Sequence, residues 1–336
     1  MILPLVGVVA LLLWFFLPTT PRPDSPWSFA LPCYSSIAQA DFSGVDYGLW
    51  QHVPSFLQQG YWTLILSALC AALAVYLMAE LNNANVLLRV SSRMLSSMLA
   101  ILLAFAILCH RFQPGSVVML LSLLSFFPLF ATYQMPHPMP TFVAYLLLSV
   151  ASLIFPKLLW MVPAYWGLQI YLRAFSFRCL VASLLAILLP YWFYGGIAVI
   201  TSSLPDLVAH ARAVIDFQWY GYATLNRNDL LTFAFVLLLF LSGTIDFYLH
   251  SFLDKTRTRI LHHVIILHGL FVTLLQCLMP QYVSIFLPLL LVDAAILFGH
   301  FFTLTHTRFS HLYNLFLLAL ALLVVAAQYV TLFRSM

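Results

Sequence analysis

The last third of the chain places ionisable residues within long apolar runs, among them Asp246, His268, Asp293 and His300. A carboxylate that faces lipid is costly, so we expect these side chains to face the interior of a helix bundle or water. His268 and Asp293 lie at similar positions in two consecutive, antiparallel runs and could meet at one depth. Asp293 and His300 are seven residues apart and would share a helix face. A buried Asp–His pair can carry a proton in a transport step, or it can simply join two helices by a hydrogen bond.

Basic side chains cluster in two short turns next to these runs. Guanidinium and ammonium groups at headgroup level bind phosphate, so an anionic lipid or a lipid-linked phosphate could dock there. The alternative is the ordinary excess of basic residues in cytoplasmic loops. No metal site is predicted, because His300, His306 and His311 are not at the i, i+4 spacing that places two ligands on one helical face. The candidates for binding anionic headgroups are Lys255, Arg257, Arg259, His306 and Arg308.

Recognisable catalytic motifs are absent from the sequence. It contains no HExxH, GxSxG, Walker loop or GxGxxG, so neither an enzyme class nor a cofactor is predicted. Polar residues between positions 201 and 229 could contact a saccharide or a diphosphate, although a solvated loop commonly has this composition. They are His210, Arg212, Asp216, Arg227 and Asp229.

Composition places nearly the whole chain in lipid. Of its 336 residues, 63% are hydrophobic and 7% are charged, and the mean hydropathy is +1.00. A soluble domain carries about a quarter charged residues, so this chain could not cover a water-facing surface. The formal net charge of +4 is scattered, without the dense basic face of a nucleic-acid binder. The five cysteines form no CxxC pair, so neither a disulfide framework nor a zinc knuckle is supported.

Eleven apolar runs predict an all-α, polytopic transmembrane bundle of ten or eleven spans, in one integral membrane domain over residues 1–336. As one helix, Thr141–Leu172 would be about 48 Å long, against a hydrocarbon core of about 30 Å. A break at Pro156 is therefore expected to give two spans. The runs are Ile2–Pro18, Trp62–Met78, Met94–Cys109, Ser116–Thr132, Thr141–Phe155, Leu158–Leu172, Cys179–Ile200, Leu230–Tyr248, Ile260–Leu278, Tyr282–Phe302 and Leu312–Leu332.

Basic residues also predict the orientation of the chain. Eight Lys and Arg residues fall in short turns on one side, and six, including Lys157, are spread over longer segments on the other. Short cytoplasmic loops are enriched in Lys and Arg, so this density favours a cytoplasmic N-terminus. The inside turns are then 80–93, 173–178, 250–259 and 304–311, and the long outside loops are 19–61 and 201–229.

One outside segment has the pattern of an amphipathic helix. Ser203-Leu-Pro-Asp206 resembles a helix start. Apolar side chains then recur at helical spacing through Ile215, whereas Asp206, His210 and Asp216 are expected to share the opposite, polar face. The pattern predicts a short helix that lies flat on the outer interface, either as a connector or as a lid over a lateral opening.

Several short motifs recur in one known family. They are Asn85-Val-Leu-Leu-Arg-Val-Ser-Ser-Arg93, Phe155-Pro-Lys-Leu-Leu-Trp160 with Tyr165-Trp166-Gly167, Asp254-Lys-Thr-Arg-Thr-Arg259 and Leu304-Thr-His-Thr-Arg308. Together they resemble an uncharacterised family of bacterial multi-pass inner-membrane proteins, a domain of unknown function. The resemblance spans most of the chain and implies a bacterial inner-membrane location. It transfers no catalytic or ligand-binding residues.

Three functions remain open from the sequence. Transport or flipping of a small or amphiphilic substrate, including a phosphate-bearing one, requires a polar cavity that reaches Asp293. A scaffold or assembly subunit of an envelope-biogenesis complex requires a solid core and an apolar groove for a protein partner. A membrane-embedded transferase for a lipid-linked substrate requires a lateral cleft under the amphipathic helix, containing Arg212 or Arg227. Membrane lipids are partners in each case, and nucleic acid is a partner in none.

Overall fold

The computed structural model describes residues 60–88, 93–106, 109, 112–216 and 227–304, with the single residues Trp50, Val53 and Leu317. Every regular element in these ranges is a helix, so the predicted all-α fold is confirmed. The predicted runs Ile2–Pro18 and Leu312–Leu332 lie outside the described residues, as does nearly all of the loop 19–61.

The described helices are α3 (Gly60–Asn85), α4 (Met94–Phe105), α5 (Pro114–Ala131), α6 (Pro138–Ile154), α7 (Met161–Tyr171), α8 (Phe177–Ile200), α9 (Leu204–Ile215), α10 (Arg227–His250), α11 (Thr256–Leu278) and α12 (Val283–Leu304), with the 3₁₀ helices η4 (Pro156–Trp160), η6 (Ser251–Leu253) and η7 (Pro280–Tyr282). Six of them, α3, α5, α8, α10, α11 and α12, are long and apolar enough to cross a membrane. The chain is therefore a multi-pass membrane protein. Proline opens α5, α6 and α9, where the first N–H groups of a helix have no helical acceptor to lose.

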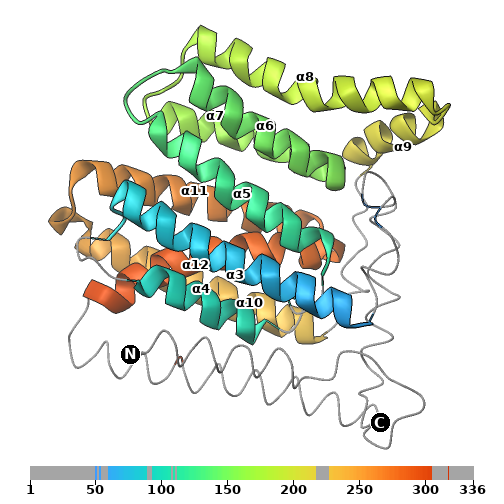
Figure 1. Ribbon diagram of the computed structural model, residues 1–336. Helices are drawn as coiled ribbons and strands as arrows, with labels where there is room; N and C mark the ends of the chain where they lie inside the picture. The colour runs from blue at the N-terminus through green and yellow to red at the C-terminus, as the bar shows by residue number, and fades with distance from the viewer. Residues whose placement is uncertain are drawn as a thin grey trace, which may run out of the picture.

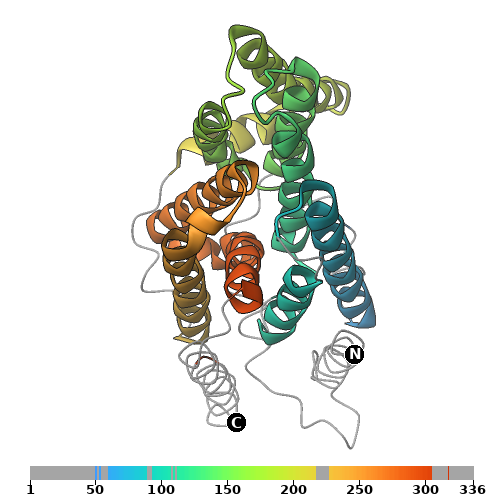
Figure 2. The same cartoon turned by 90° about the vertical axis from the view of Figure 1, so that its left-hand side faces the viewer.

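Helix α12 forms the centre of the bundle. It packs against α4, α5, α10 and α11 (Figures 1 and 2), and 94% of its most apolar stretch is buried. A helix that is apolar on every side and surrounded by protein reads as a single continuous hydrophobic run. This explains why the sequence gives α12 no polar face.

Glycines let other helices approach α12 closely. A Cβ added at Gly243 of α10 would lie 2.8 Å from the backbone carbonyl carbon of Leu297. A Cβ at Gly115 of α5 would overlap the backbone of Ser284. Such small residues are what allow helix backbones to pack tightly where lipid cannot supply a hydrophobic driving force.

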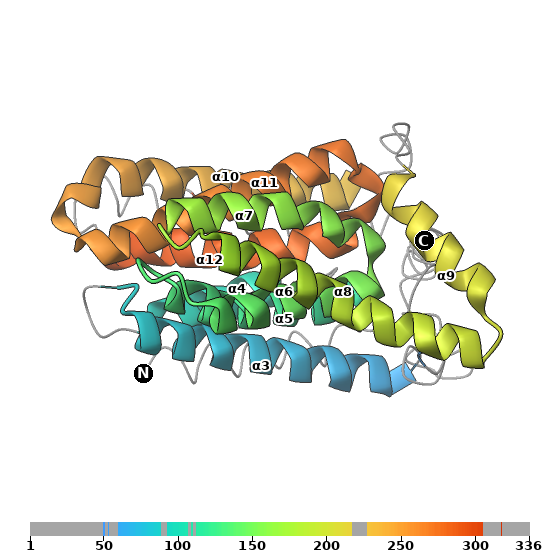
Figure 3. The ribbon, with the colours of Figure 1, turned by 90° about the horizontal axis from the view of Figure 1, so that it is seen from above.

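A second group of helices, α6, α7 and α8, lies beside this core (Figure 1). The predicted break at Pro156 is confirmed, because α6 ends at Ile154 and η4 separates it from α7. Helix α8 packs on α6 and α9, and only 22% of its most apolar stretch is buried. Helix α9 crosses the end of α8 (Figure 3), so the predicted amphipathic helix is also confirmed.

The bundle has two chemically different ends. At one end, which we call the basic end, Thr258 donates to the carbonyl oxygen of Val86, and the N–H of Gln134 donates to the carbonyl oxygen of Leu172. The turns after α3, α5, α7 and α10 thus meet there, as the distribution of basic residues predicts. The opposite end carries α9, η4 and η7.

Candidate functional site

The predicted contact between His268 and Asp293 is confirmed. His268 Nδ1 donates to Asp293 Oδ2 at 2.8 Å, from α11 to the middle of α12. The side chains are 1% and 0% exposed. Helix packing against α12 has therefore placed an ionisable pair where neither water nor lipid reaches it.

Aromatic rings enclose this pair. The rings of Phe126 and Tyr165 lie edge-on to the His268 ring, with centroids 4.9 and 6.0 Å away. Gly269 leaves the space that the ring of Phe240 occupies next to Asp293. The enclosure fixes the geometry of both side chains.

Two polar atoms of the pair lack a hydrogen-bond partner among the described residues. These are Nε2 of His268 and Oδ1 of Asp293, both fully buried. Buried polar atoms nearly always have a hydrogen-bond partner. His268 Nε2 and Asp293 Oδ1 are exceptions, and each can take part in one further hydrogen bond. The pair is chemically able to gain, hold or release a proton without breaking its own hydrogen bond.

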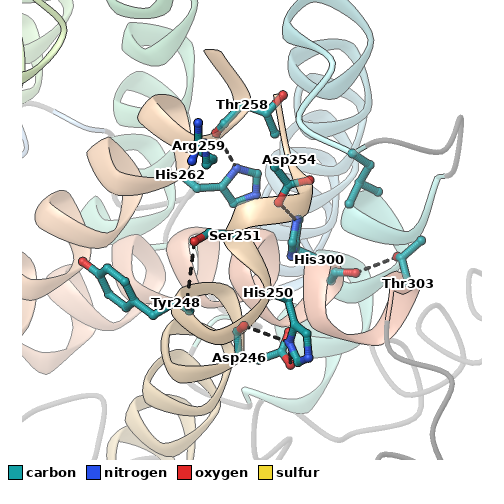
Figure 4. A network of polar contacts seen from close by, with 12 residues as sticks. Asp246, Tyr248, His250, Ser251, Asp254, Thr258, Arg259, His262, His300 and Thr303 are labelled. Carbon is teal, nitrogen blue, oxygen red and sulfur yellow. Dashed lines mark hydrogen bonds and ion pairs between the residues drawn. The ribbon is translucent and has the colours of Figure 1, made fainter. Parts of the chain in front are cut away.

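A second buried pair, which the sequence did not predict, lies nearer the basic end. His300 Nε2 donates to Asp254 Oδ2 at 3.1 Å, and both side chains are almost fully buried (Figure 4). Asp293 and His300, which were expected to share one face of α12, each bond to a residue outside that helix, His268 and Asp254 respectively. Asp254, which follows η6 near the end of the α10–α11 turn, accepts the hydrogen bond of His300.

His262 extends this second pair. Its Nδ1 donates to the carbonyl oxygen of Thr258 at 2.9 Å, which fixes the proton on that nitrogen. Its Nε2 is buried without a partner, and its ring centroid lies 4.7 Å from that of His300. His262 can therefore accept one proton or one hydrogen bond inside this cluster.

A third pair lies at the end of α10. His250 Nδ1 lies 2.8 Å from Asp246 Oδ1, one helical turn away, and donates to the carbonyl oxygen of Asp246 at 3.1 Å (Figure 4). Asp246 is buried and His250 is partly exposed. The sequence correctly placed Asp246 away from lipid but did not identify its partner, although the i, i+4 spacing was available as a signal.

An apolar layer separates Asp254, His262 and His300, which we call the outer cluster, from the central pair of His268 and Asp293. His262 and His268 are six residues apart on α11, and Asp293 and His300 are seven apart on α12, which corresponds to about 9 Å and 10.5 Å along the two helix axes. Fully buried aliphatic side chains fill the interval: Ile265, Ile266, Ile296 and Leu297. In this conformation the central pair is sealed from the basic end, so the polar cavity that the transport hypothesis requires at Asp293 is closed here.

The predicted headgroup-binding residues are partly engaged with protein. Lys255 and Arg257 are exposed, and Arg257 donates to Asn85 Oδ1 at 3.3 Å. Arg259 is half-buried and donates to Thr256 at 3.4 Å. His306 and Arg308 lie outside the described residues. Within the described part of the chain, no group of three or more His, Cys, Asp or Glu residues is arranged to hold a metal ion.

Helix α9 differs from its predicted orientation. His210 was expected on a water-facing side, but it is 1% exposed, with its ring against those of Tyr191 and Tyr194 of α8. Burial lowers the pKa of His210 from 6.5 to about 4. Apolar side chains of α9, including Leu204 and Ile215, are exposed instead, which suits a helix that lies in a lipid interface.

Two cavities border this end of the molecule. One, of about 640 Å³, runs along α9 and is lined in part by Arg212 and Asp216. This is the place where the transferase hypothesis requires a cleft; the side chain of Arg227, its other candidate, lies outside the described residues. The second, of about 340 Å³, is an apolar groove between α6 and α8, lined by Leu146, Val150, Leu153, Leu189, Pro190, Phe193, Tyr194 and Ile197.

Comparison with known proteins gives no relative: no protein-family model matches the chain, and no curated protein is similar to it in sequence.

Proposed function

We propose that this protein moves a small or amphiphilic substrate across the bacterial inner membrane and that proton exchange at Asp293 and His268 drives the movement. The observation that carries the proposal is the sealed hydrogen bond between these two side chains at the centre of the most buried helix. The proposal rests on the presence of an ionisable pair at a position that membrane proteins otherwise fill with aliphatic residues.

A purely structural contact between α11 and α12 would not require an ionisable pair. Removing two ionisable groups from water costs several kcal/mol per charge, and replacing a buried pair with well-packed apolar residues is often neutral or stabilising. A pair that only held α11 to α12 would thus be an expensive means of doing so. Proton storage in the low-dielectric interior is a function that aliphatic residues cannot replace.

The outer cluster supplies a route for protons in this proposal. Asp246–His250, Asp254–His300 and His262 all lie near the basic end, and the ring centroids of His262 and His300 are 4.7 Å apart. With the predicted cytoplasmic N-terminus, this end faces the cytoplasm. The aliphatic layer then acts as the inner gate, which opens when α11 and α12 shift against each other and closes in the conformation described here.

Phosphate-bearing amphiphiles are the substrate class that the basic end favours. Lys255 and Arg257 are exposed beside the proton route, where they can hold an anionic headgroup.

The test uses proteoliposomes that contain the purified chain, pyranine inside and NBD-labelled phosphatidic acid. We expect an imposed proton gradient to speed movement of the lipid between leaflets, together with proton entry. Asp293→Asn should reduce both rates to those of protein-free vesicles. Asp206→Asn, an exposed carboxylate of α9, is the control and should match the wild type. Equal rates for Asp293→Asn and wild type, or a wild type without activity, would contradict the proposal.

The apolar groove between α6 and α8 favours a second candidate, the scaffold of an envelope-biogenesis complex. Its lining is almost wholly apolar, and α8 exposes large side chains beside it, as a surface for a transmembrane partner would. Leu189→Trp should fill the groove and remove a specific protein from mild-detergent affinity purifications analysed by mass spectrometry. Leu184→Trp, exposed on α8 but outside the groove, is the matched control. Identical co-purifying proteins for both variants and wild type would exclude this candidate.

A further inference from the structure

A buried lysine lies at the end of the bundle opposite the basic end. Lys157, in η4 between α6 and α7, is 4% exposed. Its Nζ donates to the hydroxyl of Tyr282 at 2.9 Å and lies 4.4 Å from the centre of that ring. The chain has only two lysines, and the other one, Lys255, is exposed at the basic end.

This ammonium group has no ion pair among the described residues. Its one hydrogen-bond partner is a neutral phenol, and an ammonium group has three N–H donors. The Tyr282 ring offers a further weak attraction and is itself packed edge-on against Phe155. A buried cation without a counter-charge is costly, and such cations in membrane proteins are generally paired. The charge of Lys157 is thus unbalanced, and two of its N–H groups are free to donate to an anion.

Unpartnered amide atoms gather around the same short helix, η7. Gln276 donates to the carbonyl oxygen of Pro280, which leaves its Oε1 buried without a partner. Both side-chain amide atoms of Gln281, the residue between Pro280 and Tyr282, are also buried without a partner. Whichever way the Gln281 amide is assigned, it presents one free donor and one free acceptor.

We propose that Lys157, Gln276 and Gln281 form a binding site for an anion that also carries hydroxyl groups, such as a polyol phosphate. The anionic oxygens take the free N–H groups of Lys157 and Gln281, and the hydroxyl groups donate to the free amide oxygens of both glutamines. The ligand is either a free phosphate ester or the headgroup of a glycerophospholipid. The site lies at the other end of the bundle from the proposed proton route and does not depend on it.

The test measures thermal unfolding of the purified, delipidated chain. Glycerol 3-phosphate is titrated in detergent, and nanodiscs of phosphatidylglycerol are compared with nanodiscs of phosphatidylcholine. We expect a saturable rise in Tm of about 2–5 °C in at least one arm. A response to glycerol 3-phosphate identifies a free ester as a ligand, and a response to phosphatidylglycerol alone identifies a headgroup.

Matched variants decide between this site and a general response to anions. Lys157→Met should abolish the rise, whereas Arg178→Met, which removes an exposed cation that neither proposal uses, should keep it. Gln281→Leu, a change at a half-buried position that leaves the charge in place, should weaken apparent binding about tenfold and covers the case in which Lys157→Met does not fold. A wild type that responds in neither arm, or a wild-type response in Lys157→Met or Gln281→Leu, would overturn the proposal.

Discussion

Helices α12 and α8 have almost the same length and similar apolar composition, yet they occupy opposite environments. The most apolar stretch of α12 is 94% buried, whereas that of α8 is 22% buried. Asp293 and His300 both lie on α12, and the exposed side of α8 carries large apolar residues such as Phe193. Hydropathy therefore identifies a span but not its surroundings, and ionisable groups mark the span that protein encloses.

Among tests of the difference between α12 and α8, breaking the central pair should change the free energy of unfolding most. His268→Leu leaves the Asp293 carboxyl group buried without its partner and should cost about 3–5 kcal/mol of unfolding free energy. The double variant His268→Leu/Asp293→Leu should recover to within about 1 kcal/mol of the wild type. SDS-driven unfolding in mixed micelles measures both values. If the double variant is as unstable as the single one, the contact between His268 and Asp293 itself stabilises α12. The loss in the single variant would then not come only from leaving Asp293 without a partner.

Paired glycine substitutions should show the same contrast at the backbone. Gly243→Ala forces a methyl group against the backbone of α12 and should cost about 1–3 kcal/mol. Gly196→Ala on α8 meets nothing within 4 Å and should be neutral or stabilise the helix by up to about 1 kcal/mol. The same unfolding measurement applies. Equal effects at the two sites would remove the distinction between an enclosed and a peripheral helix.

Acidification should loosen the peripheral region first. His210 is neutral in the fold because burial lowers its pKa to about 4, and the unfolded value is about 6.5. The folded state therefore binds fewer protons, so this contribution is complete above pH 6.5 and is lost as the pH falls toward 4. Hydrogen exchange of Leu204–Ile215, corrected for intrinsic rates, should accelerate about tenfold from pH 7 to pH 5. His210→Phe should lack this acceleration, and its persistence there would assign the effect to another group.

The smallest effect is expected on the lipid-facing surface of α8. Leu185 is 55% exposed, so Leu185→Ala removes few protein contacts and should change the unfolding free energy by less than about 0.5 kcal/mol. A loss of more than about 1 kcal/mol in micelles would show that this surface is covered, for example by a second copy of the chain.

Sequence patterns were sufficient for the helices and for one site contact. Apolar runs identified the six long spans that the described residues contain, and the antiparallel order of α11 and α12 predicted that His268 and Asp293 meet. The pair of Asp254 with His300 could not be predicted, because it depends on how a turn folds back onto a helix 46 residues later. The orientation of His210 also escaped prediction. A hydrophobic pattern assumes one wet face, whereas α9 presents apolar residues to lipid and buries an imidazole between tyrosines.

The central position of α12 also constrains biosynthesis. Helices enter the membrane in the order of translation, and α12 begins at Val283, so α4, α5 and α10 are inserted before the helix that they surround exists. The glycine-containing surfaces of α5 and α10 must wait in lipid or against a chaperone. Since Asp293 bonds to the helix that immediately precedes it, we expect α11 and α12 to enter as a hairpin, with the acidic side chain already neutralised by its histidine.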